Sequence, residues 1–171
     1  MMYRTIAKLQ RVIPRATLFK VGFNLSPMYR RSTGRVRYVS PDLRTVRIEI
    51  PLSWRNANYV GTMFGGSMLS ATDPVLMVQL INILGSDYVV WDQSVEMRFR
   101  RPAKGRLFST FEYGEEELEE IRASVRETGE MELVKSIELR DRSGELIASG
   151  SKVLYVADKE FRRQKVREKN S

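Results

Sequence analysis

The sequence predicts an α+β domain in which an antiparallel sheet of about six strands wraps around one long buried helix. Residues 67–84 are apolar almost all the way round a helix, which is typical of a helix enclosed by protein or lipid. Segments of alternating polar and apolar residues lie on both sides of this run. The later segments are joined by short turns, so they pair antiparallel. A sheet of this kind, curled around the helix, buries it on most sides.

The predicted central helix carries polar residues that favour protein over lipid surroundings. Asp73, Gln79 and Asn82 lie within it, and an acid at the centre of a bilayer costs about 2.5–3.5 kcal/mol. Pro74 removes one helical hydrogen bond, and Gly85 is placed to end the helix. We therefore expect a helix enclosed by the protein.

The remaining elements follow from local periodicity and turn residues. We expect a hairpin at 35–50, a loop at 56–66, strands at 88–101 and 106–113, a surface helix at 115–128, and a last hairpin formed by 131–140 and 145–157. Simple alternation in strand 88–101 places Gln93 on the same face as Trp91 and Val95. Asp92 and Ser94 are then expected on the opposite, polar face, where Asp92 is solvated.

The charge is concentrated at the two ends of the chain. The net charge of the 171 residues is +8, but residues 1–47 carry eleven Arg and Lys against one acid, and residues 159–171 carry six against two. We expect a basic, helical N-terminal segment (1–34), a central domain (35–158) and a basic tail (159–171) that is a frayed helix or lacks fixed structure. Solvated ends are the favoured interpretation. Nucleic-acid binding is not expected, and membrane contact is a less favoured alternative.

The composition excludes several kinds of chemistry. The chain has no His and no Cys, which excludes Ser-His-Asp and Cys-His catalysis and zinc sites built on those residues. Acid–base chemistry near neutral pH is left to Asp, Glu, Lys or Tyr. No metal is expected. The lack of cysteine fits a reducing compartment, and residues 1–20 lack the apolar core of a secretory signal, so we expect a cytoplasmic protein.

The stretch from Gly65 to Asp73 is the strongest candidate for chemistry. Gly65 and Gly66 precede the buried helix, and unobstructed N–H groups at a helix N-terminus bind an anionic oxygen. Asp73 is a carboxylate in an otherwise apolar helix, where an idle role is unexpected. Two alternatives stay open: the glycines simply begin the helix, or Asp73 is a buried residue satisfied by neighbouring amides.

The helix geometry indicates that one substrate cannot use both features of a single chain. Gly66 and Asp73 lie on one face but about 10 Å apart along the axis. A reacting carbonyl must lie about 3 Å from its oxyanion donors. Two copies of the helix, side by side and antiparallel, would bring one glycine end to the other copy's Asp73. We therefore expect a twofold homodimer, or a dimer of dimers.

These residues resemble a known family. Asn58-x-x-Gly61-Thr62-x-Phe64-Gly65-Gly66, followed by Asp73 seven residues after the second glycine, is similar to the signature of hotdog acyl-CoA thioesterases of the phenylacetyl-CoA thioesterase-like group. Residues 91–105 resemble the long strand of that group. The resemblance covers about residues 45–157. Phe64 stands where the group has His, which indicates a branch that departs from the group at this position.

The resemblance implies a fold, a reaction and a set of site residues. It implies a hotdog fold, hydrolysis of acyl-CoA or acyl-carrier thioesters, and no cofactor. Asp73 would be the general base or nucleophile, the Gly65 N–H would polarise the carbonyl, and Asn58 would orient the carbonyl or the water. We expect the substrate to contact Gly66, Phe64, Gln93 and Ser94. The basic residues Arg98, Arg100, Arg101 and Lys104 are a candidate site for CoA phosphates, and a solvated strand end is the alternative.

Three classes of function compete. The first is thioester hydrolysis. The second is a non-catalytic module that binds acyl groups or lipids, which Phe64 favours. The third is association with nucleic acid or membrane through the basic ends, which loss of binding at moderate salt would reveal.

Overall fold

A computed structural model describes residues 13–169 of the chain, and it contains one six-stranded antiparallel sheet. The strand order is β1-β2-β4-β5-β6-β3. The strands are β1 (Arg35–Val39), β2 (Thr45–Ile50), β3 (Tyr88–Phe99), β4 (Leu107–Glu112), β5 (Glu130–Arg140) and β6 (Leu146–Asp158). The helices are α2 (Arg15–Leu25), α3 (Pro27–Arg31), α4 (Gly65–Leu84), α5 (Glu115–Thr128) and α6 (Lys159–Lys169).

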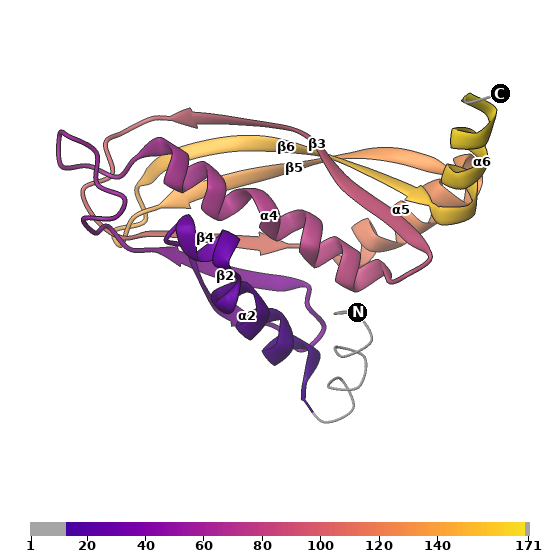
Figure 1. Ribbon diagram of the computed structural model, residues 1–171, viewed down its shortest axis with the longest axis horizontal. Helices are drawn as coiled ribbons and strands as arrows, with labels where there is room; N and C mark the ends of the chain where they lie inside the picture. The colour runs from indigo at the N-terminus through magenta and orange to yellow at the C-terminus, as the bar shows by residue number, and fades with distance from the viewer. Residues whose placement is uncertain (1–12, 170–171) are drawn as a thin grey trace.

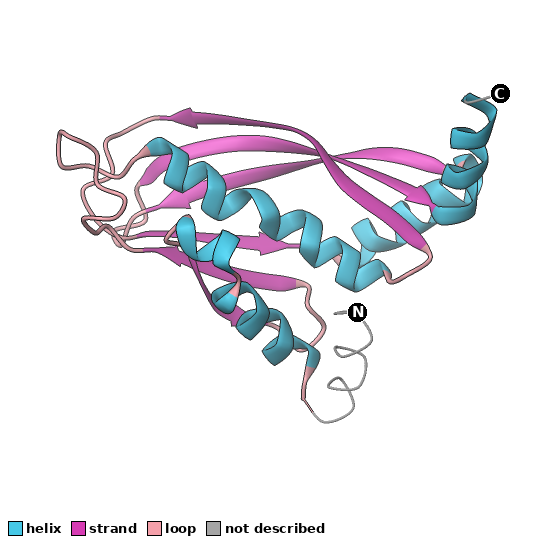
Figure 2. Cartoon of the chain, in the orientation of Figure 1, coloured by secondary structure: helices cyan, strands magenta, loops and turns pink. Residues whose placement is uncertain are grey.

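The sheet curves around α4. In Figure 1 the helix runs along the middle of the molecule, with β3, β5 and β6 on one side of it and β2 and β4 on the other. The short helices α2 and α3 lie beside β1, and α5 and α6 gather at the opposite end from the loop that precedes α4 (Figure 2). This is the hotdog fold, so the predicted fold class is confirmed.

Most predicted elements are present, with small shifts of their bounds. The central helix begins at Gly65, two residues earlier than expected, and ends at Leu84, followed by Gly85, whose φ of 91° suits glycine. The tail forms the helix α6, and the Phe161 ring packs against Gly129. Residues 1–12 of the predicted basic N-terminal segment lie outside the described residues.

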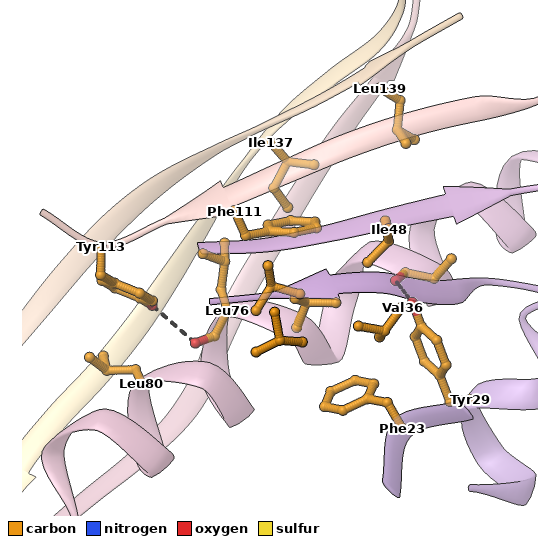
Figure 3. Packing of buried hydrophobic residues seen from close by; sticks show 14 of the residues in the cluster. Phe23, Tyr29, Val36, Ile48, Leu76, Leu80, Phe111, Tyr113, Ile137 and Leu139 are labelled. Carbon is orange, nitrogen blue, oxygen red and sulfur yellow. Dashed lines mark hydrogen bonds between the residues drawn. The ribbon is translucent and has the colours of Figure 1, made fainter. Parts of the chain in front are cut away.

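Hydrogen bonds from three neighbouring parts of the chain anchor the middle of α4. The buried Tyr29 hydroxyl donates to the Ala71 carbonyl (3.2 Å), and the buried Tyr113 hydroxyl donates to the Leu76 carbonyl (3.0 Å; Figure 3). The Lys152 ammonium donates to the Asp73 carbonyl. These bonds fix the helix on both sides of Pro74, where the proline ring interrupts the helical hydrogen-bond ladder. The position of Asp73 is therefore set by the core.

A β-bulge in β3 overturns the alternation that the sequence suggested for this strand. Asp92 pairs with Leu154 and Ser94 pairs with the next residue, Val153, which leaves Gln93 as the extra residue. The extra residue breaks the alternation, so the residues before the bulge and those after it are out of phase. Asp92, paired with the buried Leu154, therefore shares the face toward α4 with Val95, paired with the buried Lys152, whereas Trp91 stacks on Tyr155 on the other face. The expectation of a solvated Asp92 is wrong for this reason.

The half of the sheet nearest β1 carries an ion-pair cluster around Glu49. This carboxylate is buried, with Arg37 Nε and Arg106 Nη1 each 2.9 Å away. The hydrogen bond from Arg37 holds the pKa of Glu49 below its usual 4.5. A lowered folded-state pKa gives stability that is present above 4.5 and lost as the pH falls through the folded value.

Replacing Glu49 with glutamine should therefore make the free energy of unfolding less dependent on pH in the acid range. We expect Glu49→Gln to lower the free energy of unfolding near pH 7 by about 1 kcal/mol, because the two arginine side chains are 48% and 40% exposed and solvent screens the pairs. The deficit should shrink below pH 4.5. Denaturant unfolding at several pH values measures both effects, and a deficit independent of pH would contradict the role given to the ion pairs.

Candidate active site

Asp73 on α4 meets two charged partners from the sheet. Lys152 on β6 is fully buried, with a side-chain exposure of 0%. Its Nζ lies 2.6 Å from Asp73 Oδ1 and 2.9 Å from Asp92 Oδ2 on β3. One ammonium thus lies between two carboxylates from different elements. Such a buried cation is stable only with close anionic partners, so the three residues form one electrostatic unit.

The two acids of this unit differ in their environments. Asp92 is the more enclosed: its side chain is 25% exposed, and its Oδ1 is buried without a hydrogen-bond partner among the described residues. Burial raises the pKa of Asp92, against the opposing effect of Lys152. The Asp73 side chain is 42% exposed. Asp73 is therefore the acid that can meet a substrate.

The Asp73 carboxylate keeps one oxygen available. Oδ1 accepts the hydrogen bond from Lys152, and Oδ2 has no partner among residues 13–169. A carboxylate held by one oxygen, with the other free, has the geometry of a general base or nucleophile. Lys152 fixes its orientation from within the core.

Asp73 lies at the centre of a partly exposed stripe along α4. Gly66, Ser70, Asp73, Met77 and Ile81 recur every three or four residues, and each is partly or fully exposed. Within the described residues, α4 is the one helix long and apolar enough to span a membrane, and 44% of its most apolar window is buried in the protein. The prediction that protein encloses the helix therefore holds for one side of α4. The stripe on its other side is not covered by the described residues of the same chain.

Two aromatic rings flank the N-terminus of α4. The Phe99 ring is so close to Gly65 that an added Cβ would lie 2.7 Å from it. The Phe64 ring covers Gly66 in the same way, at 2.3 Å. The backbone N–H groups of both glycines make no backbone hydrogen bond within the described chain. The helix therefore begins with free donors beside an apolar wall.

The other residues singled out in the sequence lie in different surroundings. Asn58 stabilises its own loop: its Oδ1 accepts the Thr62 and Val60 N–H groups, and its Nδ2 donates to Thr62 Oγ1 (2.9 Å). Gln93, at the bulge, and Ser94 are exposed. Within one chain, Asn58 has no hydrogen bond to the cluster of Asp73 and Lys152.

Sequence reasoning missed Lys152, although β6 carries a signal for it. The strand places residues 148, 150, 152, 154 and 156 on one face, and its other four members are Ala, Gly, Leu and Val. A lysine in the middle of an apolar face needs a buried partner. That partner is the carboxylate pair formed by Asp73 and Asp92.

A hotdog domain with a lysine-held carboxylate on its central helix is the class of protein that this structure defines. The model of the family called "Domain of unknown function (DUF4442)" matches residues 15–156. The chain belongs to this family. A search of the curated proteins gives no match.

Solved structures share the fold at low sequence identity. PA5026 from Pseudomonas aeruginosa, described as a protein of unknown function and probable thioesterase, is 21% identical, with a TM-score of 0.74 over 83% of this chain and 95% of its own. A protein of unknown function from Chlorobaculum tepidum is 17% identical, with a TM-score of 0.67 over 83% and 93%. The thioesterase HI1161 from Haemophilus influenzae is 12% identical, with a TM-score of 0.54 over 88% of both chains.

Proposed function

We propose that this protein hydrolyses acyl-CoA-type thioesters, with Asp73 as the catalytic carboxylate. One observation carries the proposal: Asp73 Oδ1 is held 2.6 Å from the buried Lys152 ammonium, while Oδ2 is free on a partly exposed helix face. The free N–H groups at Gly65 and Gly66 supply the second requirement, an oxyanion hole. The resemblance to hotdog thioesterases of the phenylacetyl-CoA thioesterase-like group supports the same reaction.

The proposed reaction uses only side chains, backbone and water. Asp73 Oδ2 takes a proton from a water molecule as the water oxygen attacks the thioester carbonyl carbon. The carbonyl oxygen becomes an oxyanion, which the N–H groups of Gly65 and Gly66 stabilise. The C–S bond then breaks, the sulfur takes the proton from Asp73, and a carboxylic acid and a thiol leave. No cofactor beyond the acyl-CoA substrate is required.

The proposed site is completed by a second copy of the chain. The rise of α4 keeps Gly66 and Asp73 about 10 Å apart in one chain. Two uncovered features favour a twofold dimer: the stripe on α4 that contains Asp73, and β3, a 12-residue strand at the edge of the sheet. Long open edges favour pairing with another chain. In such a dimer, each oxyanion hole would face the partner's Asp73.

A charge on the stripe should weaken this dimer. Ile81 is 39% exposed on the stripe, so we expect Ile81→Glu to raise the dimer dissociation constant at least about tenfold, since an unpaired charge would be buried. Sedimentation at micromolar concentration measures this. Val134→Glu is the matched control, because Val134 is 66% exposed on β5. A monomeric parent with full activity would contradict the two-copy site.

The direct test of function is a hydrolysis screen over acyl-CoAs of different chain length and ring content. We expect thiol release from at least one member of the panel, and its loss in Asp73→Asn. If the parent hydrolyses no member, the catalytic proposal fails and the binding function below takes its place.

The second candidate function is acyl or lipid binding without catalysis. Phe64 and Phe99 are 58% and 52% exposed, respectively, beside the N-terminus of α4. They would form an apolar wall for an acyl chain, and no His is present to assist chemistry. This function predicts binding of a non-hydrolysable acyl-CoA analogue that Asp73→Asn leaves unchanged. Phe64→His would then be the variant in which to look for gained turnover.

A further inference from the structure

A basic cavity lies beside α3, away from the Asp73 cluster. It has a volume of about 680 Å³ and is bounded by the end of α2, the start of β1 and the loop 51–55. Arg30, Arg35, Arg37 and Arg55 line it, and no acidic residue does. The proposed hydrolysis uses none of these residues.

Most of the positive charge at this cavity is unbalanced. Arg37 is paired with Glu49 at 2.9 Å. Arg30 and Arg55 have no ion pair with any of residues 13–169, and Arg35 acts on Glu49 at longer range without forming an ion pair. Three guanidinium groups around one cavity repel one another unless an anion binds between them. Their planar donor sets match phosphate oxygens in pairs, so a ligand with more than one phosphate fits best.

Trp54 adds an aromatic surface to the cavity. Its side chain is 84% exposed, and the Arg55 guanidinium carbon lies 5.3 Å from its ring centroid. A ring this exposed beside the arginines offers a flat apolar face to a ligand in the cavity. Planar bases stack on such rings, with a gain of about 1–3 kcal/mol per base. Phosphate-binding arginines beside a stacking surface are the chemistry of a nucleotide site.

The cavity is joined to the N-terminus of α4 through one buried residue. Asn56 Nδ2 donates to the cavity residue Thr33 (2.8 Å), and the Asn56 carbonyl accepts the Phe64 N–H (2.8 Å). The wall of the cavity and the start of the proposed oxyanion hole therefore belong to one hydrogen-bonded unit. A ligand bound in the cavity lies close to the helix end where the thioester is proposed to react.

The basic residues at the end of β3 are a weaker alternative. Arg98 Nε lies 2.9 Å from Glu96, and Arg101 Nε lies 2.9 Å from Glu145. Arg100 donates to Ser149 Oγ. These charges are largely balanced or engaged, unlike those around the cavity.

We propose that this cavity binds the phosphorylated adenosine end of coenzyme A, with the adenine on Trp54 and the phosphates on Arg30, Arg35 and Arg55. The proposed nucleotide site rests on the proposed function and deepens it, because it identifies the substrate as a CoA ester rather than a carrier-protein ester. A free polyphosphate shares part of this chemistry but has no base to stack.

The test is binding of adenosine 3′,5′-bisphosphate, followed by quenching of tryptophan fluorescence. Trp54 and Trp91 are the two tryptophans, and Trp91 is stacked on Tyr155, so we expect Trp54→Leu to abolish the quench. Arg35→Gln should raise the dissociation constant about tenfold, the value for one lost charge-assisted hydrogen bond. Arg101→Gln, the matched control at the end of β3, should leave it within about twofold.

Three outcomes would overturn the proposal. The first is an equal loss of affinity in Arg35→Gln and Arg101→Gln, and the second is no quench at all. The third is inorganic pyrophosphate binding as tightly as the nucleotide, which would show an anion site without base recognition. The binding measurement does not require turnover, so its result does not depend on whether the protein hydrolyses thioesters. In an active enzyme, Arg35→Gln should raise KM for an acyl-CoA but not for the same acyl group on N-acetylcysteamine.

Discussion

Asparagine at position 73 is expected to reduce thioester hydrolysis by about 10²–10⁴-fold, the usual contribution of a positioned base. The substitution keeps the size of the side chain and a hydrogen-bond acceptor for Lys152, and it removes the basic oxygen. Asp73 is 42% exposed and Asp92 remains as an anionic partner of the buried Lys152, so the fold should survive, with a loss of stability smaller than that of Lys152→Met. Turnover and unfolding are measured on the same samples.

The companion variant Asp92→Asn separates the two acids. It removes the other carboxylate bound to Lys152 but leaves the partly exposed one, so we expect most of the turnover to remain. Activity of Asp73→Asn within a few-fold of the parent would remove Asp73 from the mechanism. A larger loss in Asp92→Asn than in Asp73→Asn would move the base to Asp92.

Methionine at position 152 is expected to cause the largest loss of stability. Lys152 is fully buried between Asp73 and Asp92, and removing one member of a buried ion pair costs about 3–5 kcal/mol. The value here should lie near the lower end, because Asp73 is partly exposed. Turnover should fall as well, since Lys152 is the positioning residue for the Asp73 carboxylate.

The pH dependence of this loss is the specific readout. Lys152 lowers the pKa of Asp92, so its removal should raise that pKa further. A raised folded-state pKa favours the folded protein below the ordinary value of 3.8, and this advantage is lost as the pH rises through the folded pKa. The stability deficit of Lys152→Met should therefore be largest near pH 7 and shrink on acidification.

Two further variants control for this effect. Lys165→Met breaks the exposed pair with Glu130 and should cost no more than about 1 kcal/mol. The double variant Lys152→Met with Asp92→Asn removes one of the two acids left without a cation and should recover part of the stability but not the turnover. Equal losses in Lys152→Met and Lys165→Met would contradict the buried cluster.

The architecture could be predicted because its helices and strands can be recognised from local sequence patterns alone. The apolar run 67–84 and the alternating strands after it specify a sheet around a helix. Asp73 could be recognised as a candidate site residue because a carboxylate in an apolar helix is costly unless it has a hydrogen-bond or charge partner. The bounds of α5 match the prediction because acidic residues in its first turn and Gly129 at its end mark both termini.

The charge partner of Asp73 required the fold itself. A bulge at Gln93 turns Asp92 toward α4, and nothing in simple alternation marks that extra residue. Lys152 is 79 residues from Asp73 in the chain, so only the pairing of β6 with β3 brings the three charges together. The cavity around Trp54 likewise combines α3, β1 and the loop 51–55.

Subunit complementation between two inactive variants tests the central claim most directly. Asp73→Asn removes the base, and Gly65→Val obstructs the N-terminus of α4, where even an added Cβ would lie 2.7 Å from the Phe99 ring. In a mixed dimer, one site carries both defects, and the other combines an intact Asp73 from one chain with an intact Gly65 from its partner. We predict that each variant alone is inactive and that the purified mixed dimer recovers about half of the parent turnover, because one of two sites is intact. A mixed dimer as inactive as its two parents would contradict a thioesterase site shared between two copies of α4.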